Sequence, residues 1–212
     1  RPTVTNNGEL LTSSGIVYVN ATQNGESLTI NGGLATTIPF PTGFVGNPTS
    51  PILLFFGDTT VNGDFVWVQD TGNVAAVWDT MQGNYFSFAI DSVGWTNVDQ
   101  IAGNAPFTTG VSVDLPPGHD GGNSKVFMYF SNINSVVSID DWGLTGTFSM
   151  GSSYQLSIGE VVKFVAISEI GGQWSYHVTS DIPIADPHTE TLPSLTNAAN
   201  EQAVQTAILN EL

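Results

Sequence analysis

The feature that most constrains the fold is a strict alternation of apolar and polar residues in short segments. It is clearest in GIVYVNAT (15–22), DFVWVQD (64–70) and YFSFAID (85–91). A period of two is that of a β-strand, whose successive side chains point to opposite faces. Turn residues separate the segments, and Asn24-Gly25 is typical of a tight hairpin. The pattern therefore predicts an all-β protein of antiparallel strands.

The strand-like segments form two groups on either side of the loop-like stretch AGNAPFTTG (102–110). We predict two antiparallel β-sandwich-like, immunoglobulin-like lobes over residues 1–102 and 103–184. Residues 185–212 are predicted to be a linker and a short C-terminal helix, because the stretch 183–194 is acidic and rich in proline.

The C-terminal segment is the one part of the chain with helical periodicity. Val204, Ile208 and Leu212 recur at a spacing of four and would share one face, with Thr196 or Asn197 as the N-cap. Because exposed apolar stripes are uncommon, we expect this amphipathic helix to dock on its own domain. The alternative is that it binds a neighbouring chain during assembly.

The charge balance excludes several classes of partner. The chain has 3 basic and 19 acidic residues, a net charge of −16. Binding to nucleic acid requires clusters of Lys and Arg, which Arg1, Lys125 and Lys163 cannot form. We therefore expect no nucleic-acid partner and no anionic membrane surface, and the apolar runs are too short for membrane insertion.

Composition also bears on location. Charged residues make up only 10% of the chain, well below the usual quarter, so the polar surface must come from Thr, Ser, Asn, Gln and Gly. The chain has no cysteine, which excludes disulfides, thiolate nucleophiles and Cys-type metal sites. It begins Arg1-Pro2, and we expect a secreted, extracellular or cell-surface product whose signal has been removed.

One loop offers a candidate calcium site. GDTTVNGD (57–64) places the side-chain oxygens of Asp58, Asn62 and Asp64 close together in sequence, and such oxygens are the ligands that Ca²⁺ prefers. The loop lacks the bidentate Glu of an EF-hand, and Asn62-Gly63 is itself a hairpin signal. The hairpin turn is the favoured interpretation, and we otherwise expect no cofactor.

A second loop holds a histidine next to an acidic residue. PPGHDGGNS (116–124) holds His119, Asp120 and Asn123, and a His-Asp pair can bind a metal or act as a base. However, a loop rich in Pro and Gly is a poor platform for catalysis, which favours a surface loop. His177 and His188 lie at no metal-binding spacing from it.

Aromatic residues suggest a sugar-binding surface. SIDDWG (138–143) places Asp140 and Asp141 beside Trp142. Adjacent acids in a strand point to opposite faces, so a turn is the favoured interpretation. Four tryptophans would carry the contacts of a carbohydrate-binding module if they were exposed, namely Trp67, Trp78, Trp142 and Trp174.

No catalytic motif is recognisable. The chain has no Gly-x-Ser-x-Gly elbow, no P-loop and no Gly-x-Gly-x-x-Gly after a strand, so we predict a non-enzymatic protein. A glycosidase needs only two carboxylates about 5–10 Å apart. With 19 acidic residues, a hydrolase with an unrecognised carboxylate pair is the less favoured alternative.

The segment FSFAIDSVGWTNVD (86–99) is the most distinctive in the chain. We expect the alternating residues at its start to form the closing strand of the first lobe. Trp95 is expected to plug the end of the sandwich, since a large aromatic after a strand commonly does so. Asn97 and Asp99 are expected to fix the turn that leads into the second lobe.

Several segments carry a family resemblance. They are GELLTSSGIVYVNATQNGESLTINGG (8–33), GLATTIPFP (33–41), FVWVQDTGNVAAVWD (65–79), SFAIDSVGWTNVD (87–99), DLPPGHDGGNSKVFMYFSNINSVVSI (114–139) and SIGEVVKFVAISEIGGQWSYHV (157–178). The chain resembles the C-terminal portion of Bacteroidetes surface proteins and lipoproteins, in which a carboxypeptidase-regulatory-like β domain precedes a ZU5-like region. Val98 stands where that family often has Cys, so no thiol or lipid role is implied there. The resemblance implies a cell-surface location and a non-catalytic β architecture.

These observations predict a non-enzymatic extracellular structural or adhesive protein of the cell surface, with a subunit of a surface filament or layer as one form. Self-assembly would proceed by β-strand addition, in which an exposed sheet edge accepts residues 1–12 or the C-terminal tail of a neighbour, or through the C-terminal helix. The main alternative is a carbohydrate-binding module with a glycan partner.

Overall fold

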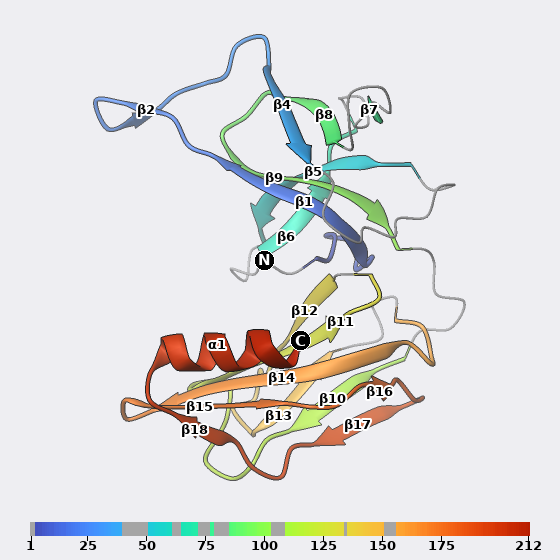
Figure 1. Cartoon of the computed structure of the whole chain (residues 1–212), viewed down its shortest axis with the longest axis vertical. Coiled ribbons are helices and arrows are strands. Elements are labelled where there is room, and N and C mark those ends of the chain that lie inside the picture. The colour runs from blue at the N-terminus through green and yellow to red at the C-terminus, as the bar shows by residue number, and fades with distance from the viewer. Residues whose placement is uncertain are drawn as a thin grey trace. The chain divides into compact units, whose positions relative to one another are not determined.

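The fold is all-β with one short C-terminal helix, as the alternation predicts. The computed structural model describes residues 3–39, 51–60, 65–71, 77–78, 85–102, 109–133, 135–150 and 156–212. The chain divides into two compact units, which we call unit 1 (Thr3–Gly103) and unit 2 (Asn104–Leu212). Figure 1 shows the strands of each unit.

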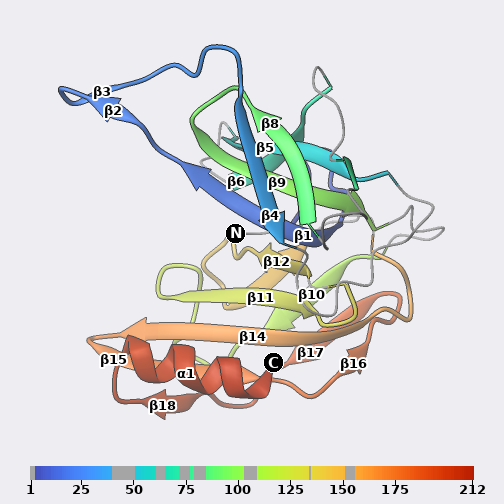
Figure 2. The same cartoon turned by 45° about the horizontal axis from the view of Figure 1, so that its top comes forward.

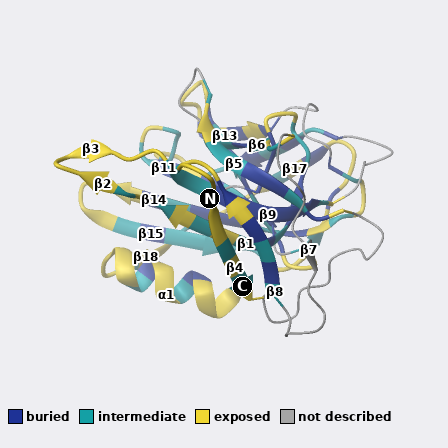
Figure 3. Ribbon diagram, turned by 90° about the horizontal axis from the view of Figure 1, so that it is seen from above, coloured by how far each residue is buried: buried dark blue, intermediate teal, exposed yellow. Residues whose placement is uncertain are grey.

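Unit 1 contains two antiparallel sheets and a hairpin. The four-stranded sheet has the order β1 (Leu11–Val19), β9 (Gly94–Ile101), β5 (Leu53–Thr59), β6 (Phe65–Gln69). The three-stranded sheet has the order β4 (Leu34–Pro39), β8 (Tyr85–Ile90), β7 (Val77–Trp78). The hairpin joins β2 (Thr22–Gln23) to β3 (Glu26–Ser27) through Asn24 and Gly25, which both adopt positive φ, as their sequence predicts. It is exposed along its whole length (Figure 3).

The alternation in β8 accounts for the core between these two sheets. Phe86, Phe88 and Ile90 are buried and pack against Leu54 and Val98 of the four-stranded sheet. This face-to-face packing is that of a β-sandwich. The other face of the four-stranded sheet buries a second cluster around Leu11, Phe55 and Trp67. Strand β9 is therefore covered on both faces.

The N-terminal segment of unit 1 pairs within its own chain. The Trp67 N–H donates to the Val4 carbonyl (3.2 Å), and the Asn6 N–H donates to the Trp67 carbonyl (2.9 Å). The Leu11 N–H donates to the Thr3 carbonyl (2.9 Å). Val4 and Leu10 are buried. The segment that we considered as a strand for a neighbouring chain thus already occupies the edge of β6 in its own unit.

Unit 2 has a three-stranded and a larger sheet. The three-stranded sheet has the order β13 (Thr147–Met150), β10 (Val111–Asp114), β17 (His188–Thr191). The larger sheet runs β12 (Ser135–Ile139), β11 (Ser124–Phe130), β14 (Val161–Ile170), β15 (Gln173–Val178), β18 (Thr196–Ala198), and β16 (Ile182–Pro183) pairs with β14. Strand β11 shows the layering, because Val126, Met128 and Phe130 are buried on one face while Phe127 lies on the other.

Helix α1 (Glu201–Glu211) covers that other face of the larger sheet. Val204 and Ile208 are buried against Val165, as expected for a helix that docks on its own domain (Figure 2). The Lys163 ammonium donates to the Glu211 carbonyl in the last turn, where the helix dipole favours a cation. Among the described residues, no helix is long and apolar enough to span a membrane.

The N-cap is Asn200, rather than Thr196 or Asn197. Its side chain accepts a hydrogen bond from the Ala203 N–H (2.9 Å). Thr196 and Asn197 instead belong to β18, which pairs with Trp174–Tyr176 of β15. The backbone hydrogen bonds of this edge strand compete with an earlier start of the helix.

The segment 185–194, expected to be a linker, also differs from the prediction. Residues His188–Thr191 form β17, which pairs in parallel with Val111–Asp114 of β10. Ile184, His188 and Leu192 are buried. Because this edge strand buries only one of its side chains, its sequence shows little alternation of apolar and polar residues. The strand is therefore not recognisable among the neighbouring Pro, Asp and Glu residues.

Candidate functional site

The candidate calcium site falls mostly outside the described residues. Asn62 and Asp64 lie there, and Asp58 is an exposed residue of β5 whose Oδ1 accepts from the Thr59 N–H (2.7 Å). In the part of the chain that the structure describes, no three His, Asp or Glu side chains gather as metal ligands would. Calcium binding at 58–64 therefore stays a prediction.

The segment Trp95-Thr96-Asn97-Val98-Asp99 does not form the expected turn. These residues lie within β9, at the centre of the four-stranded sheet of unit 1. Asn97 and Asp99 are fully buried, whereas Trp95 is half-buried and lies 4.7 Å (ring centroids) from the ring of Tyr18. The change of direction occurs earlier, at 91–93, where the chain passes from β8 in one sheet to β9 in the other.

The Asp99 side chain hydrogen-bonds to an irregular part of β1. The register between β1 and β9 shifts between Ser13 and Ile16, which is the mark of a β-bulge. Asp99 Oδ1 accepts from the Ser14 N–H (2.7 Å), and Oδ2 accepts from the Asn97 amide. Burial raises the pKa of Asp99 to about 7 despite these hydrogen bonds. Its role is thus to satisfy a backbone N–H that the bulge leaves without a strand partner.

Two loops of unit 2 are joined by a buried carboxylate. Asp141 accepts backbone hydrogen bonds from Gly146 (2.7 Å), Thr145 (3.0 Å) and Gly121 (3.2 Å). Burial alone would raise the pKa of Asp141, but these N–H donors outweigh it and hold the pKa below its ordinary value. Asp140 instead forms a β-bridge with Ser149. The two acids therefore do not form one sugar site, in agreement with the turn interpretation.

His119, Asp120 and Asn123 hold their own loop together. His119 Nδ1 lies 2.8 Å from Ser168 Oγ. Asp120 Oδ1 accepts from the Gly122 N–H (2.8 Å), and Asn123 Oδ1 accepts from the Asp120 N–H (3.1 Å). The His119–Ser168 pair has the spacing of a base and a nucleophile. However, Ser168 is only 1% exposed, and its hydroxyl is already bonded to the Ser124 hydroxyl (3.0 Å) and the Asn123 carbonyl (3.2 Å).

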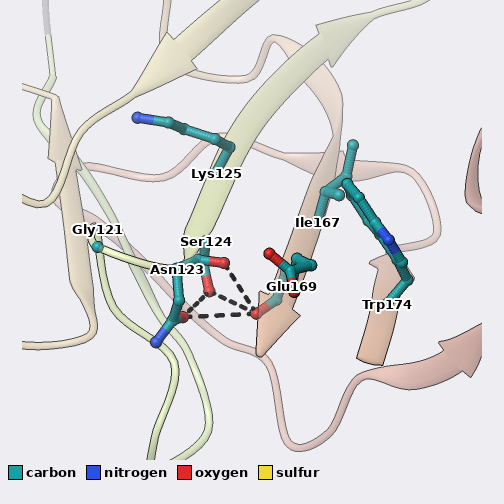
Figure 4. Close-up of a pocket in the computed structure, with 9 residues that line it drawn as sticks. Gly121, Asn123, Ser124, Lys125, Ile167, Glu169 and Trp174 are labelled. Atoms are coloured by element: carbon teal, nitrogen blue, oxygen red, sulfur yellow. Dashed lines mark hydrogen bonds between the residues drawn. The ribbon is translucent and has the colours of Figure 1, made fainter. Parts of the chain in front are cut away.

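Beside this loop lies a pocket of about 270 Å³ on the face of the larger sheet that also carries α1. Asn123, Ser124, Lys125, Glu169 and Trp174 contribute to its walls. In Figure 4, Glu169 lies between Ser124 and Trp174, whereas the Lys125 side chain extends away from Trp174. Sequence reasoning identified Trp174 but not Glu169 or Lys125. The alternation in β11 and β14 places these two on one face, but only the pairing of the strands brings them together.

The four candidate tryptophans have different environments. Trp67 is fully buried in the core of unit 1, so it cannot stack on a sugar. The side chain of Trp78 lies outside the described residues. Trp142 is 70% exposed, and Trp174 is half-buried at the pocket. Among the three candidate tryptophans whose side chains the structure describes, the two accessible ones both belong to unit 2.

Comparisons with known proteins do not assign this chain to a family. No protein-family model matches the chain, and no curated protein matches it. Function must therefore be argued from the residues themselves.

Proposed function

We propose that this chain is a non-enzymatic, extracellular adhesive protein of the cell surface, and that unit 2 carries its binding surface. The composition, with few charges and strands rich in Thr, Asn and Gly, favours an extracellular location. The resemblance of residues 8–33 and 87–99 to surface proteins of Bacteroidetes points the same way.

The observation that carries the proposal is a pair of exposed apolar side chains on the turn between β12 and β13. Trp142 is 70% exposed and Leu144 is 61% exposed, and we call these two residues the loop tip. Large apolar side chains exposed together commonly mark a binding surface, and tryptophan is among the residues enriched at binding hot spots. A protein without a partner gains nothing from leaving them in water.

The loop tip is also held rigidly. Asp141 precedes the tip, and its carboxylate accepts from the backbone N–H groups of Thr145 and Gly146 after the tip and of Gly121 in the neighbouring loop. A Cβ atom on Gly121 would lie 2.6 Å from the Asp141 carbonyl oxygen, so the two loops pack closely. Leu144 adopts a φ of 52°, which is unusual for a bulky residue. Rigid anchors lose little entropy on binding, which favours recognition.

Two further features support a non-catalytic role. The His119–Ser168 pair has its hydroxyl buried, as described above. At the pocket beside Trp174, Glu169 is the one carboxylate among the lining residues that the structure describes. A glycosidase needs two carboxylates.

Assembly into a surface filament or layer is part of the same proposal. Strand addition would require residues 3–10 to leave β6 and β1 of their own chain and to pair with the same strands of a neighbour. Light scattering tests this exchange. Oligomers that persist after removal of residues 1–12 would contradict it.

Adhesion is tested with beads coated with the full chain and presented to an array of glycans and extracellular-matrix proteins. We expect retention of the beads and its loss on Trp142→Ser with Leu144→Ser. The matched control is Leu209→Ser, which removes an equally exposed apolar side chain (75%) from α1. Beads that bind nothing, or that lose retention equally with the control variant, would contradict the proposal.

Carbohydrate binding is the second candidate, and the half-buried Trp174 at a pocket favours it. An aromatic ring beside hydrogen-bonding groups is suited to a sugar, which has both an apolar ring face and hydroxyls. The bead array distinguishes this candidate, because the retained spots would all be glycans.

A further inference from the structure

The pocket beside Trp174 is built on paired strands. Glu169 and Trp174 are direct cross-strand partners in β14 and β15, and Ser124 and Ser168 are partners in β11 and β14. Positions set by a β-ladder are held more precisely than positions on a loop. The walls of the pocket therefore have a fixed spacing before any ligand arrives.

A hydrogen-bond network supports the pocket from below. The Ser124 hydroxyl lies 2.7 Å from Asn123 Oδ1 and 3.0 Å from Ser168 Oγ. The Asn123 amide donates to the Gly118 carbonyl (3.0 Å). Figure 4 shows the bonds among Asn123, Ser124 and Ser168. These side chains already have partners, so they position the pocket rather than bind a ligand.

Two charged groups at the pocket are available to a ligand. Glu169 Oε1 accepts from the Gly172 N–H (2.6 Å), which fixes the side chain and leaves Oε2 as an acceptor. Lys125 is exposed and, within the described ranges, has no ion-pair partner. Glu169 and Lys125 thus offer an acceptor and a donor at one pocket without neutralising each other.

From this arrangement we propose that the pocket binds one ring of a neutral glycan, an inference that rests on carbohydrate binding, the second candidate function. The indole of Trp174 would stack on the apolar face of a pyranose. Its hydroxyls would donate to Glu169 and accept from Lys125, which are charge-assisted bonds. A volume of about 270 Å³ accommodates a single sugar ring rather than a long chain.

The charge of the protein defines which glycans fit. With a net charge of −16 and only 3 basic residues, the chain repels uronate-rich and sulfated polymers. The ligand is therefore a neutral sugar, and one ring in a shallow pocket binds weakly, with a dissociation constant on the order of 1 mM. Strong attachment then comes from many copies on one surface.

The test is calorimetric titration of the full chain with cellobiose, chitobiose and mannobiose, and with oligogalacturonate as the anionic comparison. We expect one of the neutral disaccharides to bind and the anionic one not to bind. Trp174→Ala and Glu169→Gln should each weaken binding about tenfold or more. Leu209→Ser, an exposed residue of α1 outside the pocket lining, should leave the affinity unchanged.

Each other result has a defined meaning. Trp174 also packs beside α1, so the thermal stability of Trp174→Ala must be measured alongside its affinity. If Trp174→Ala unfolds, the affinity of Glu169→Gln alone tests whether the pocket binds the sugar. Equal affinity in wild type and Glu169→Gln overturns the pocket inference, as does binding of the anionic sugar alone or of none of the four. The bead assay then judges the adhesive function separately, because the loop-tip variants act there.

Discussion

Replacing Asp99 with asparagine should remove most of the pH dependence of the stability of unit 1 between about pH 4 and pH 7. The pKa of Asp99 rises from 3.8 to about 7 on folding because the carboxyl is buried. In this window the folded state keeps a proton that the unfolded state has lost. The free energy of unfolding is therefore greatest below pH 3.8 and falls as the pH rises through about 7.

The magnitude follows from the size of this pKa change. The rise of the pKa from 3.8 to about 7 corresponds to about 4 kcal/mol of unfolding free energy. In its protonated form Asp99 gains an O–H to donate, and Asn97 Oδ1 is a buried oxygen with no hydrogen-bond partner within the described residues. The neutral acid thus suits its site better than the carboxylate.

The assay is urea unfolding followed by tryptophan fluorescence, at several pH values. A Trp142→Phe, Trp174→Phe background removes the two unit 2 tryptophans, so that the remaining signal reports on unit 1. In this background the unfolding free energy should fall with pH, and the Asp99→Asn variant should show a flat profile. Equal slopes for the two proteins would show that Asp99 does not cause the pH dependence.

Other predictions concern packing. Trp67→Ala, which empties a fully buried site, should destabilise unit 1 by about 3–5 kcal/mol in the same assay, and the half-buried Trp95→Ala by clearly less. Ile208→Ala should lower unit 2 stability by about 2–4 kcal/mol and speed hydrogen exchange in α1. Asp141→Asn should lower the melting temperature of unit 2, and its wild-type contribution, present above pH 3.8, should be lost as the pH falls through the depressed pKa.

Local patterns in the sequence predict the parts of this fold that depend on near neighbours. The alternation in YFSFAID predicts which face of β8 is buried, since Phe86, Phe88 and Ile90 line the core. Asn24-Gly25 predicts a hairpin, because both residues accept positive φ. In each case the period or the turn alone determines the result.

Features that depend on distant partners are missed. Asp99 appears as a turn residue in sequence, because the bulge that it fastens lies 85 residues away at Ser14. Strand β17 is hidden because its pairing partner, β10, lies far back in the chain. The pocket of Lys125, Glu169 and Trp174 likewise requires the register of three strands. Such juxtapositions come from tertiary pairing, which periodicity does not encode.

A non-enzymatic adhesive protein binds its ligand without turning it over, and one measurement tests both the binding and the absence of turnover. Glycan retained by the full chain on the array is recovered after prolonged incubation and its mass is compared with that of the starting glycan. We expect retention by wild type, weaker retention by the Glu169→Gln variant and an unchanged mass. A shortened glycan, or no retention at all, would contradict binding without turnover.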